Sequence, residues 1–238
     1  SSAASDVYKR QVLGWKQLLD TLKEIQHLRV VGMFLLAYWL YIDGVDTIVK
    51  MAVDYGATLK FPDSALITAL LMVQFIAFPC ALLFSLFAKK IGVKYSVMVG
   101  IIGYGIITFL GYFMSQVWHF YTLAALVGLF QGGIQALSRS YYSRLIPKNQ
   151  AAEYYGFFNM LGKFAAIIGP ALMGVVGLTM RNMLMPDSPT AEQIKAIGQE
   201  ASRWSIASIV ILFLIGAVLL FNVDEEKGRA EAEYLFKN

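Results

Sequence analysis

The sequence predicts an all-α protein, a polytopic membrane helix bundle with six transmembrane helices. Three observations predict this fold class. Apolar residues make up 58% of the 238 positions, which is too many for an ordinary soluble domain. The charged residues, 15% of the chain, gather in short segments between the apolar runs. Each run is long enough to cross about 30 Å of hydrocarbon as a helix that rises about 1.5 Å per residue.

Six apolar runs provide the expected spans. They cover residues 30–53, 65–87, 97–114, 121–142, 154–180 and 204–223. Together they form a six-helix transmembrane domain over residues 30–223. Between the last two spans, a Ser-Pro-Thr-Ala-Glu segment predicts a helix start with Thr190 as its cap.

The two ends of the chain differ from this domain. Residues 1–14 are polar and rich in small side chains, without the apolar core of a signal peptide, so we expect a disordered or artefactual segment. Residues 15–29 repeat apolar side chains at helical spacing, which predicts an amphipathic helix at the membrane interface or, equally, a linker helix. Residues 224–238 are highly charged and are expected to form a cytoplasmic tail.

Charge and motifs exclude several classes of function. The net charge of +4 does not indicate nucleic-acid binding, because the basic residues lie in short loops between spans. Most of these residues fall on one side of the membrane, which predicts that both termini are cytoplasmic. Cys80 is the lone cysteine, so neither a disulfide framework nor a thiolate metal site is expected. The sequence contains no HExxH or GxSxG motif, and we expect no enzyme activity, metal or cofactor.

A stretch from residue 128 to residue 174 is the candidate transport pathway. Polar side chains lie there within apolar runs, where they are costly unless they face protein or water. They are Gln131, Gln135, Ser138, Asn159 and Lys163. Two small-residue steps, Gly132-Gly133 and Gly169-Pro170, are expected to interrupt the helices, as transporter helices often break near a site. Two alternatives stay open: the fourth-span polar groups only hold helices together, and Lys163 extends to the cytoplasmic end.

The first span carries a second polar group. Asp43, Asp46 and Lys50 are spaced by three and four residues and therefore project from one helical face. Thr47 lies among them as a further pathway candidate, and Gly44 weakens the helix locally. Asp43 lies deepest, where apolar surroundings favour a neutral carboxyl group that a proton gradient can load and unload. Our hypothesis is that Asp43 couples proton movement to solute movement and that Asp46 modulates it. The alternative is that the span ends early and leaves Asp46 and Lys50 in water.

The loop between the second and third spans resembles a known motif. Its sequence, SLFAKKIGVK, is similar to the degenerate second copy of the loop motif of the major facilitator superfamily. Lys89, Lys90, Gly92 and Lys94 carry the likeness. Ser85 stands where that motif has its first glycine, and Lys89 where it has an acidic residue.

Three further segments point to one family. YIDGVDT (residues 41–47), QGGIQALSRS (131–140) and the run 153–170, with YYGFFNMLGK and IIGP, are similar to the C-terminal half of the vacuole-effluxer-like permeases. That family includes vacuolar amino-acid exporters related to autophagy. The resemblance covers about residues 15–225 and implies the last six of twelve spans. The missing N-terminal six-helix half is then a partner of this chain.

The resemblance implies secondary active transport of small polar solutes, amino acids among them, by alternating access, and the hypothesis for Asp43 makes this transport proton-coupled. It implies a plasma membrane location in a bacterium and a vacuolar membrane in a fungus. The competing interpretation is a non-transporting scaffold or partner subunit whose intramembrane polar residues only pack helices. The two differ in whether the polar groups of the first, fourth and fifth spans converge on one water-accessible region.

Overall fold

The computed structural model describes residue 23 and residues 28–237, and these residues form helices joined by short turns, without strands. The elements are α2 (Arg29–Thr58), α3 (Asp63–Ile91), α4 (Val93–Tyr112), α5 (Val117–Leu145), η1 (Lys148–Gln150), α6 (Ala151–Lys163), α7 (Ile168–Leu184), α8 (Ala191–Ser208), α9 (Val210–Phe221) and α10 (Glu225–Lys237). The expected segment 1–14 and nearly all of the expected helix 15–29 lie outside the described residues.

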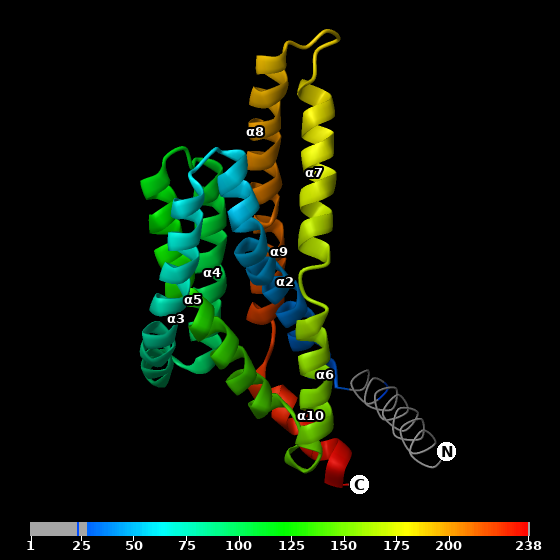
Figure 1. Cartoon of the computed structure of the whole chain (residues 1–238). Helices are drawn as coiled ribbons and strands as arrows, with labels where there is room; N and C mark the ends of the chain where they lie inside the picture. Colours follow the sequence, from blue (N-terminus) through cyan, green and yellow to red (C-terminus); the bar gives the residue numbers. More distant parts are fainter. Residues whose placement is uncertain (1–22, 24–27, 238) are drawn as a thin grey trace, which may run out of the picture.

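Six segments are long and apolar enough to cross a membrane. They are α2, α3, α4, α5, the segment Lys148–Leu184 and the segment Ala191–Phe221. The expected all-α fold with six spans is therefore confirmed for the part of the chain that the structure describes. The last two spans are each built from two helices placed end to end, as Figure 1 shows for α6 and α7.

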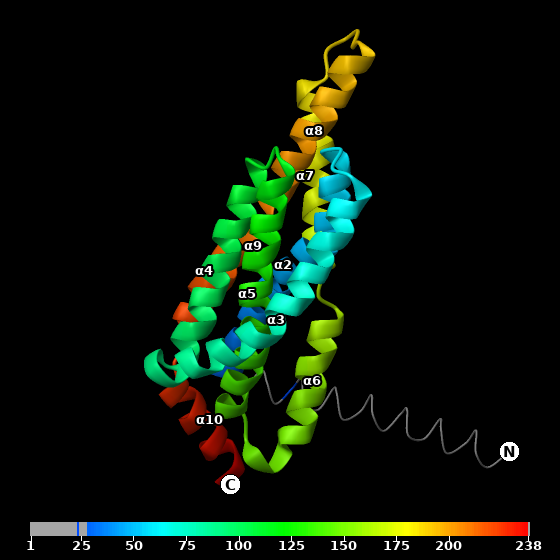
Figure 2. The same cartoon turned by 60° about the vertical axis from the view of Figure 1, so that its left-hand side comes forward.

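Helix α2 lies at the centre of the bundle and contacts every other α-helix that the structure describes. The most extensive pairings join α3 to α5, α2 to α9 and α7 to α8, and α4 packs on α5 and α9 (Figure 2). Large side chains of the core lie around α2, with Phe34 and Tyr41 fully buried. The central position of α2 gives its polar residues access to all the neighbouring spans.

Helix α3 shows the opposite pattern and exposes large apolar side chains. Phe75 is 79% exposed and Phe78 is 76% exposed, and α3 carries several more such residues. An apolar surface of this extent is unfavourable in water and is typical of a helix in contact with lipid or a partner.

The expected interruption at Gly132-Gly133 is wrong, since α5 is continuous through both residues. A Cβ atom on Gly132 would lie 2.8 Å from the carbonyl oxygen of Ala77, and one on Gly133 would collide with the ring of Phe84. Helix α2 is likewise continuous through Gly44, where a Cβ atom would lie 2.9 Å from Phe213. These glycines admit a neighbouring helix at short distance while the backbone hydrogen bonds persist.

The fifth span is broken, but at residues 164–167 rather than at Gly169-Pro170. Helix α6 ends at Lys163 and α7 begins at Ile168. Between them Ala166 has φ of +62°, a left-handed conformation that is costly for a residue with a Cβ atom. Gly169 and Pro170 lie in the first turn of α7, where the N–H that proline lacks would have no partner within the helix.

The sixth span is longer than expected because its helix starts early. Thr190 accepts a hydrogen bond from the Gln193 N–H, and the Gln193 side chain accepts one from the Thr190 N–H, which completes a capping box. The expected cap at Thr190 is thus confirmed. Helices α7 and α8 extend together beyond the ends of the other spans (Figure 1).

At the other end of the bundle, near the C-terminus, α10 and the turn between α3 and α4 hold neighbouring spans together by hydrogen bonds. Gly92 has φ of +90°, which glycine adopts without strain, and it lets α4 start one residue after α3. Lys94 donates to the carbonyl oxygens of Phe221 (2.9 Å) and Val223 (2.6 Å) at the end of the sixth span. Glu231 on α10 accepts from the Val30 N–H at 3.2 Å. Lys89 and Lys90 remain exposed.

Candidate transport pathway

Asp43 has no exposed surface and binds the start of α7. Its Oδ2 accepts from the backbone N–H groups of Ile167 (3.0 Å) and Ile168 (2.9 Å), and its Oδ1 accepts from Gly169 (2.6 Å). These three N–H groups have no acceptor within their own helix, and the positive end of the helix dipole favours a carboxylate there. A side chain of the first span therefore completes the broken fifth span.

Two small features make this contact possible. Thr47, one turn further along α2 and also buried, donates its hydroxyl to Asp43 Oδ1 at 3.3 Å. A Cβ atom on Gly169 would overlap the Thr47 hydroxyl and would lie 2.8 Å from Asp43 Oδ1. Glycine is therefore needed at position 169 for close approach of α2 and α7, rather than for a break in the helix.

Asp46 and Lys50 have different surroundings from Asp43. Asp46 is half-buried and Lys50 is exposed, although both were expected on one face with Asp43. Tyr38, two turns before Asp46 on α2, lies within electrostatic range of both Asp46 and Arg139 of α5. Asp46 and Lys50 therefore lie on a side of α2 that the neighbouring helices leave partly uncovered.

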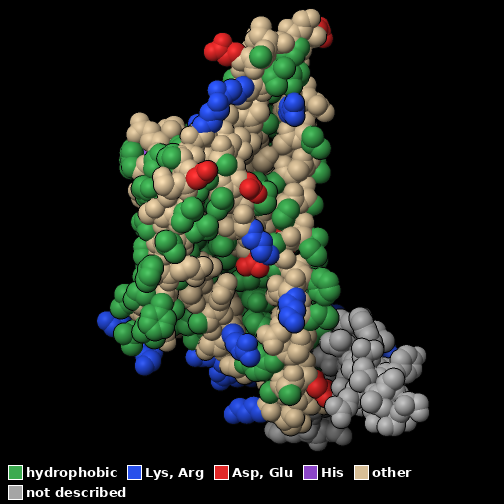
Figure 3. All heavy atoms as spheres, in the orientation of Figure 1, with side chains coloured by type: hydrophobic (Ala, Val, Ile, Leu, Met, Phe, Trp, Pro, Cys, Tyr) green, Lys and Arg blue, Asp and Glu red, His purple; other side chains and the backbone are tan. Residues whose placement is uncertain are grey.

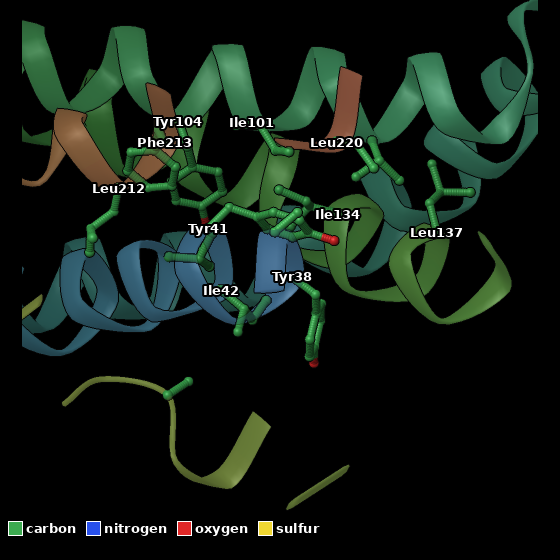
Figure 4. Packing of buried hydrophobic residues seen from close by; sticks show 14 of the residues in the cluster. Tyr38, Tyr41, Ile42, Ile101, Tyr104, Ile134, Leu137, Leu212, Phe213 and Leu220 are labelled. Carbon is green, nitrogen blue, oxygen red and sulfur yellow. The ribbon is translucent and has the colours of Figure 1, made fainter. Parts of the chain in front are cut away.

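The polar residues of α5 divide in the same way. Ser138 is fully buried; its hydroxyl donates to the Ile134 carbonyl at 2.5 Å and accepts from the Tyr41 hydroxyl at 2.6 Å. Figure 4 shows Tyr41 directed from α2 toward Ile134, whereas Tyr38 is directed away from this cluster. Gln131 is half-buried and its side-chain oxygen has no hydrogen-bond partner, while Gln135 is exposed. Ser138 therefore joins α5 to α2, whereas Gln135 lies on the exposed side of α5.

Helix α6 contributes Asn159 and Lys163, both exposed. Their neighbour Arg139 was not among the predicted site residues. Arg139 donates to Asn159 Oδ1 at 3.4 Å, and its guanidinium lies 4.8 Å from the ring centroid of Tyr155. Its position inside the expected span 121–142 was the available signal.

We call the set Asp46, Lys50, Gln135, Arg139, Asn159 and Lys163 the polar face. Its members come from α2, α5 and α6 and are half-buried or exposed. Figure 3 shows acidic and basic side chains running along the middle of one side of the molecule, flanked by apolar ones. Within the described residues, neither Lys163 nor Arg139 has a carboxylate within 4.0 Å. Nor do three or more potential metal-ligating acidic, histidine or cysteine side chains converge anywhere in that part of the chain.

Comparison with known proteins identifies the family. The profile described as "Vacuole effluxer Atg22 like" matches residues 5–187. The chain is 41% identical over 212 residues to the "Uncharacterized MFS-type transporter YxiO" of Bacillus subtilis, covering 89% of this chain and 45% of that protein. It is 28% identical over 235 residues to "Autophagy-related protein 22" of Yarrowia lipolytica, covering 93% of this chain and 36% of that protein.

The chain therefore spans less than half the length of these relatives. The match to the family profile includes the residues of α2, α5 and α6 that carry the polar face. The chain belongs to the vacuole effluxer Atg22-like family of membrane transporters of the major facilitator type.

Proposed function

We propose that this chain is the C-terminal half of a secondary active transporter that moves small polar solutes, amino acids among them, by proton-coupled alternating access. The observation that carries this proposal is the polar face. Charged groups in an apolar bundle are expensive unless they line a water-filled path or meet a partner. In transporters of this type, such a site lies between two six-helix halves, so the partner of the polar face is the N-terminal half.

The charges of the polar face support a zwitterionic solute. Asp46 offers a carboxylate to an ammonium group, and Arg139 and Lys163 offer cations to a carboxylate. Arg139 is held in place by Asn159 and by the Tyr155 ring, which leaves the rest of its guanidinium free for a bidentate contact. Amino acids carry both charges, and uncharged sugars carry neither.

Asp46 is the carboxyl group that we propose takes up the proton. It is half-buried on the polar face, where solute and protons arrive together, and Lys50 lies one turn away. Asp43, expected from the sequence to take this role, has no exposed surface and already accepts three N–H groups. A proton on Asp43 would have to displace one of these donors.

The distribution of basic residues supports an orientation. Lys89, Lys90 and Lys94 lie near one end of the bundle, together with Arg144 and helix α10. We propose that this end is cytoplasmic, with the chain's C-terminus there. The membrane would be the plasma membrane in a bacterial host and the vacuolar membrane in a fungal one.

Proteoliposomes that contain the full-length transporter test the proposal. We expect uptake of radiolabelled amino acids, from a panel of twenty, to increase when a proton gradient is imposed and to disappear with a protonophore. Asp46→Asn should abolish gradient-driven accumulation and weaken exchange, because it removes both the proton acceptor and the carboxylate offered to the ammonium group. The matched control is Asp54→Asn, since Asp54 is an exposed carboxylate on the same helix, and it should accumulate solute normally.

The scaffold interpretation makes the opposite prediction. If no amino acid is taken up and Asp46→Asn leaves the uptake measurement unchanged, the polar face serves only to bind another protein. The present chain by itself should be inactive in transport, because the site needs both halves. Robust flux through the isolated chain would contradict this arrangement.

A further inference from the structure

The two halves of the fifth span are held in very different ways. Helix α7 packs along α8 over much of its length and also contacts α2. Its first turn is bound by Asp43 through three N–H groups. Helix α6 instead packs on α2 and α5 through aromatic rings, with the Tyr38 and Phe158 centroids 4.1 Å apart and the Tyr142 and Phe158 centroids 4.9 Å apart. Its hydrogen bonds to α5 are single and spread along the helix: Tyr142 donates to the Tyr154 carbonyl at 3.1 Å, Arg139 to Asn159 at 3.4 Å, and Tyr155 to the Arg139 carbonyl at 3.5 Å. Aromatic pairs are favourable in more than one arrangement, offset-stacked or edge-to-face, whereas hydrogen bonds to an ionised carboxylate are about twice as strong as neutral ones, so we expect α6 to shift more easily than the start of α7.

The segment between these halves has the properties of a hinge. Residues 164–167 lie outside both helices, and Ala166 is held at φ of +62°. Such a conformation in a residue with a Cβ atom persists only when surrounding contacts impose it. On the α7 side these contacts come from Asp43, and on the α6 side the Trp39 indole donates to the Phe164 carbonyl at 3.4 Å.

We propose that Asp43 is the fixed pin of this hinge: it holds the start of α7 in place while α6 moves alone as the gate of the polar face. Asn159 and Lys163 lie on α6, so a swing of α6 moves these two polar groups relative to Arg139 and Asp46. Asp43 is a positioning residue in this scheme and takes no part in binding solute. The inference rests on the proposed transport function, because a gate acts only on a solute that passes.

Distances between spin labels on single helices test the pin without any solute. In a Cys80→Ser background, one pair joins Leu82→Cys on α3 to Gly156→Cys on α6. A second pair joins Leu82→Cys to Val175→Cys on α7. Leu82 and Val175 are 60% and 64% exposed, and nothing lies within 4 Å of a Cβ atom on Gly156. We expect a broad distribution for the α6 pair and a narrow one for the α7 pair.

Removal of the pin without a change of charge is the decisive variant. Gly169→Ala places a methyl group against Thr47 and Asp43 and should make the α7 pair as broad as the α6 pair. Gly174→Ala is the matched control on the same helix, with nothing within 4 Å of the added atom, and should leave the α7 pair narrow. The pin is refuted if α6 and α7 give distributions of equal width in the parent protein, or if Gly169→Ala leaves the α7 pair narrow.

A second measurement separates positioning from simple structural support. In the full-length transporter, Gly169→Ala should raise the KM for a transported amino acid at least about threefold and leave the pH profile of transport unchanged, since Asp46 is intact. An altered pH profile would mean that Asp43 itself carries the proton and would overturn its role as a fixed pin. Absence of flux in all variants contradicts the proposed function alone, because the label distances need no solute.

Discussion

Helix α5 and the fifth span both carry glycines in an apolar run, and they behave in opposite ways. Helix α5 stays continuous through Gly132 and Gly133, and the missing side chains admit α3. The fifth span breaks between Lys163 and Ile168, and its two nearest glycines, Gly162 and Gly169, lie within the last turn of α6 and the first turn of α7. The break itself contains no glycine and places Ala166 in a left-handed conformation.

The difference shows that glycine alone does not break a membrane helix. A break exposes N–H and C=O groups that hydrocarbon cannot satisfy, so it requires partners from elsewhere in the protein. In the fifth span Asp43 accepts from three N–H groups and the Trp39 indole donates to the Phe164 carbonyl, whereas the unbroken α5 needs no such partners. The partner, rather than the glycine, determines where a helix can open.

Loss of the partner should have the largest effect. Asp43→Ala leaves three N–H groups without their acceptor, that of Gly169 buried and those of Ile167 and Ile168 part-buried, and a buried donor without a partner costs about 1–3 kcal/mol. We expect the free energy of unfolding to fall by about 3 kcal/mol or more, measured by reversible unfolding in mixed detergent micelles. Asp54→Ala, at an exposed position of the same helix, should change it little. A loss below about 1 kcal/mol for Asp43→Ala would mean that the break does not depend on Asp43.

Overpacking of the contact between the unbroken helix α5 and helix α3 should have the second largest effect on stability. Gly133→Ala forces a methyl group into the ring of Phe84, and we expect a loss of about 1–3 kcal/mol with no loss of helix content. Gly156→Ala on α6 meets nothing within 4 Å and should be neutral or stabilising. Unfolding measurements and circular dichroism on both variants check this. Equal stability of the two would remove close packing as the reason for Gly133.

Thr47→Val tests the support of the carboxylate at nearly constant side-chain volume. It removes one hydroxyl donor to Asp43 Oδ1, and we expect a loss of about 1 kcal/mol in the same unfolding assay. Thr179→Val is the control, because the Thr179 hydroxyl only bonds back to its own helix at Val175. If both variants unfold alike, the Thr47 hydroxyl contributes nothing specific to the Asp43 site.

Relief of strain at the break should have the smallest effect, and of opposite sign. Ala166→Gly removes a left-handed conformation that costs about 1–2 kcal/mol, partly offset by the greater backbone entropy of glycine in the unfolded state. A net gain of about 0.5 kcal/mol is expected. The thermal unfolding temperature of the parent and variant proteins measures this gain, and a clear decrease would show that the strain is not relieved there.

The apolar runs and their lengths predicted six spans, and the cap at Thr190 followed from side chains within one turn of it. Those features are local, because they depend on hydrophobic periodicity and on neighbours a few residues away. The polar residues of the pathway were also visible one by one. Their separation into buried and exposed members was not, since Gln135 and Ser138 are three residues apart, a spacing that places both on one helical face, yet Ser138 is buried and Gln135 is exposed.

Tertiary structure decided the partner of Asp43. The N–H groups it binds lie 124 to 126 residues further along the chain, and only the packing of α7 against α2 brings them within reach. A sequence records that a carboxylate lies in an apolar run and that it must be satisfied. Which group satisfies it depends on which helix lies alongside, and that is a property of the folded bundle.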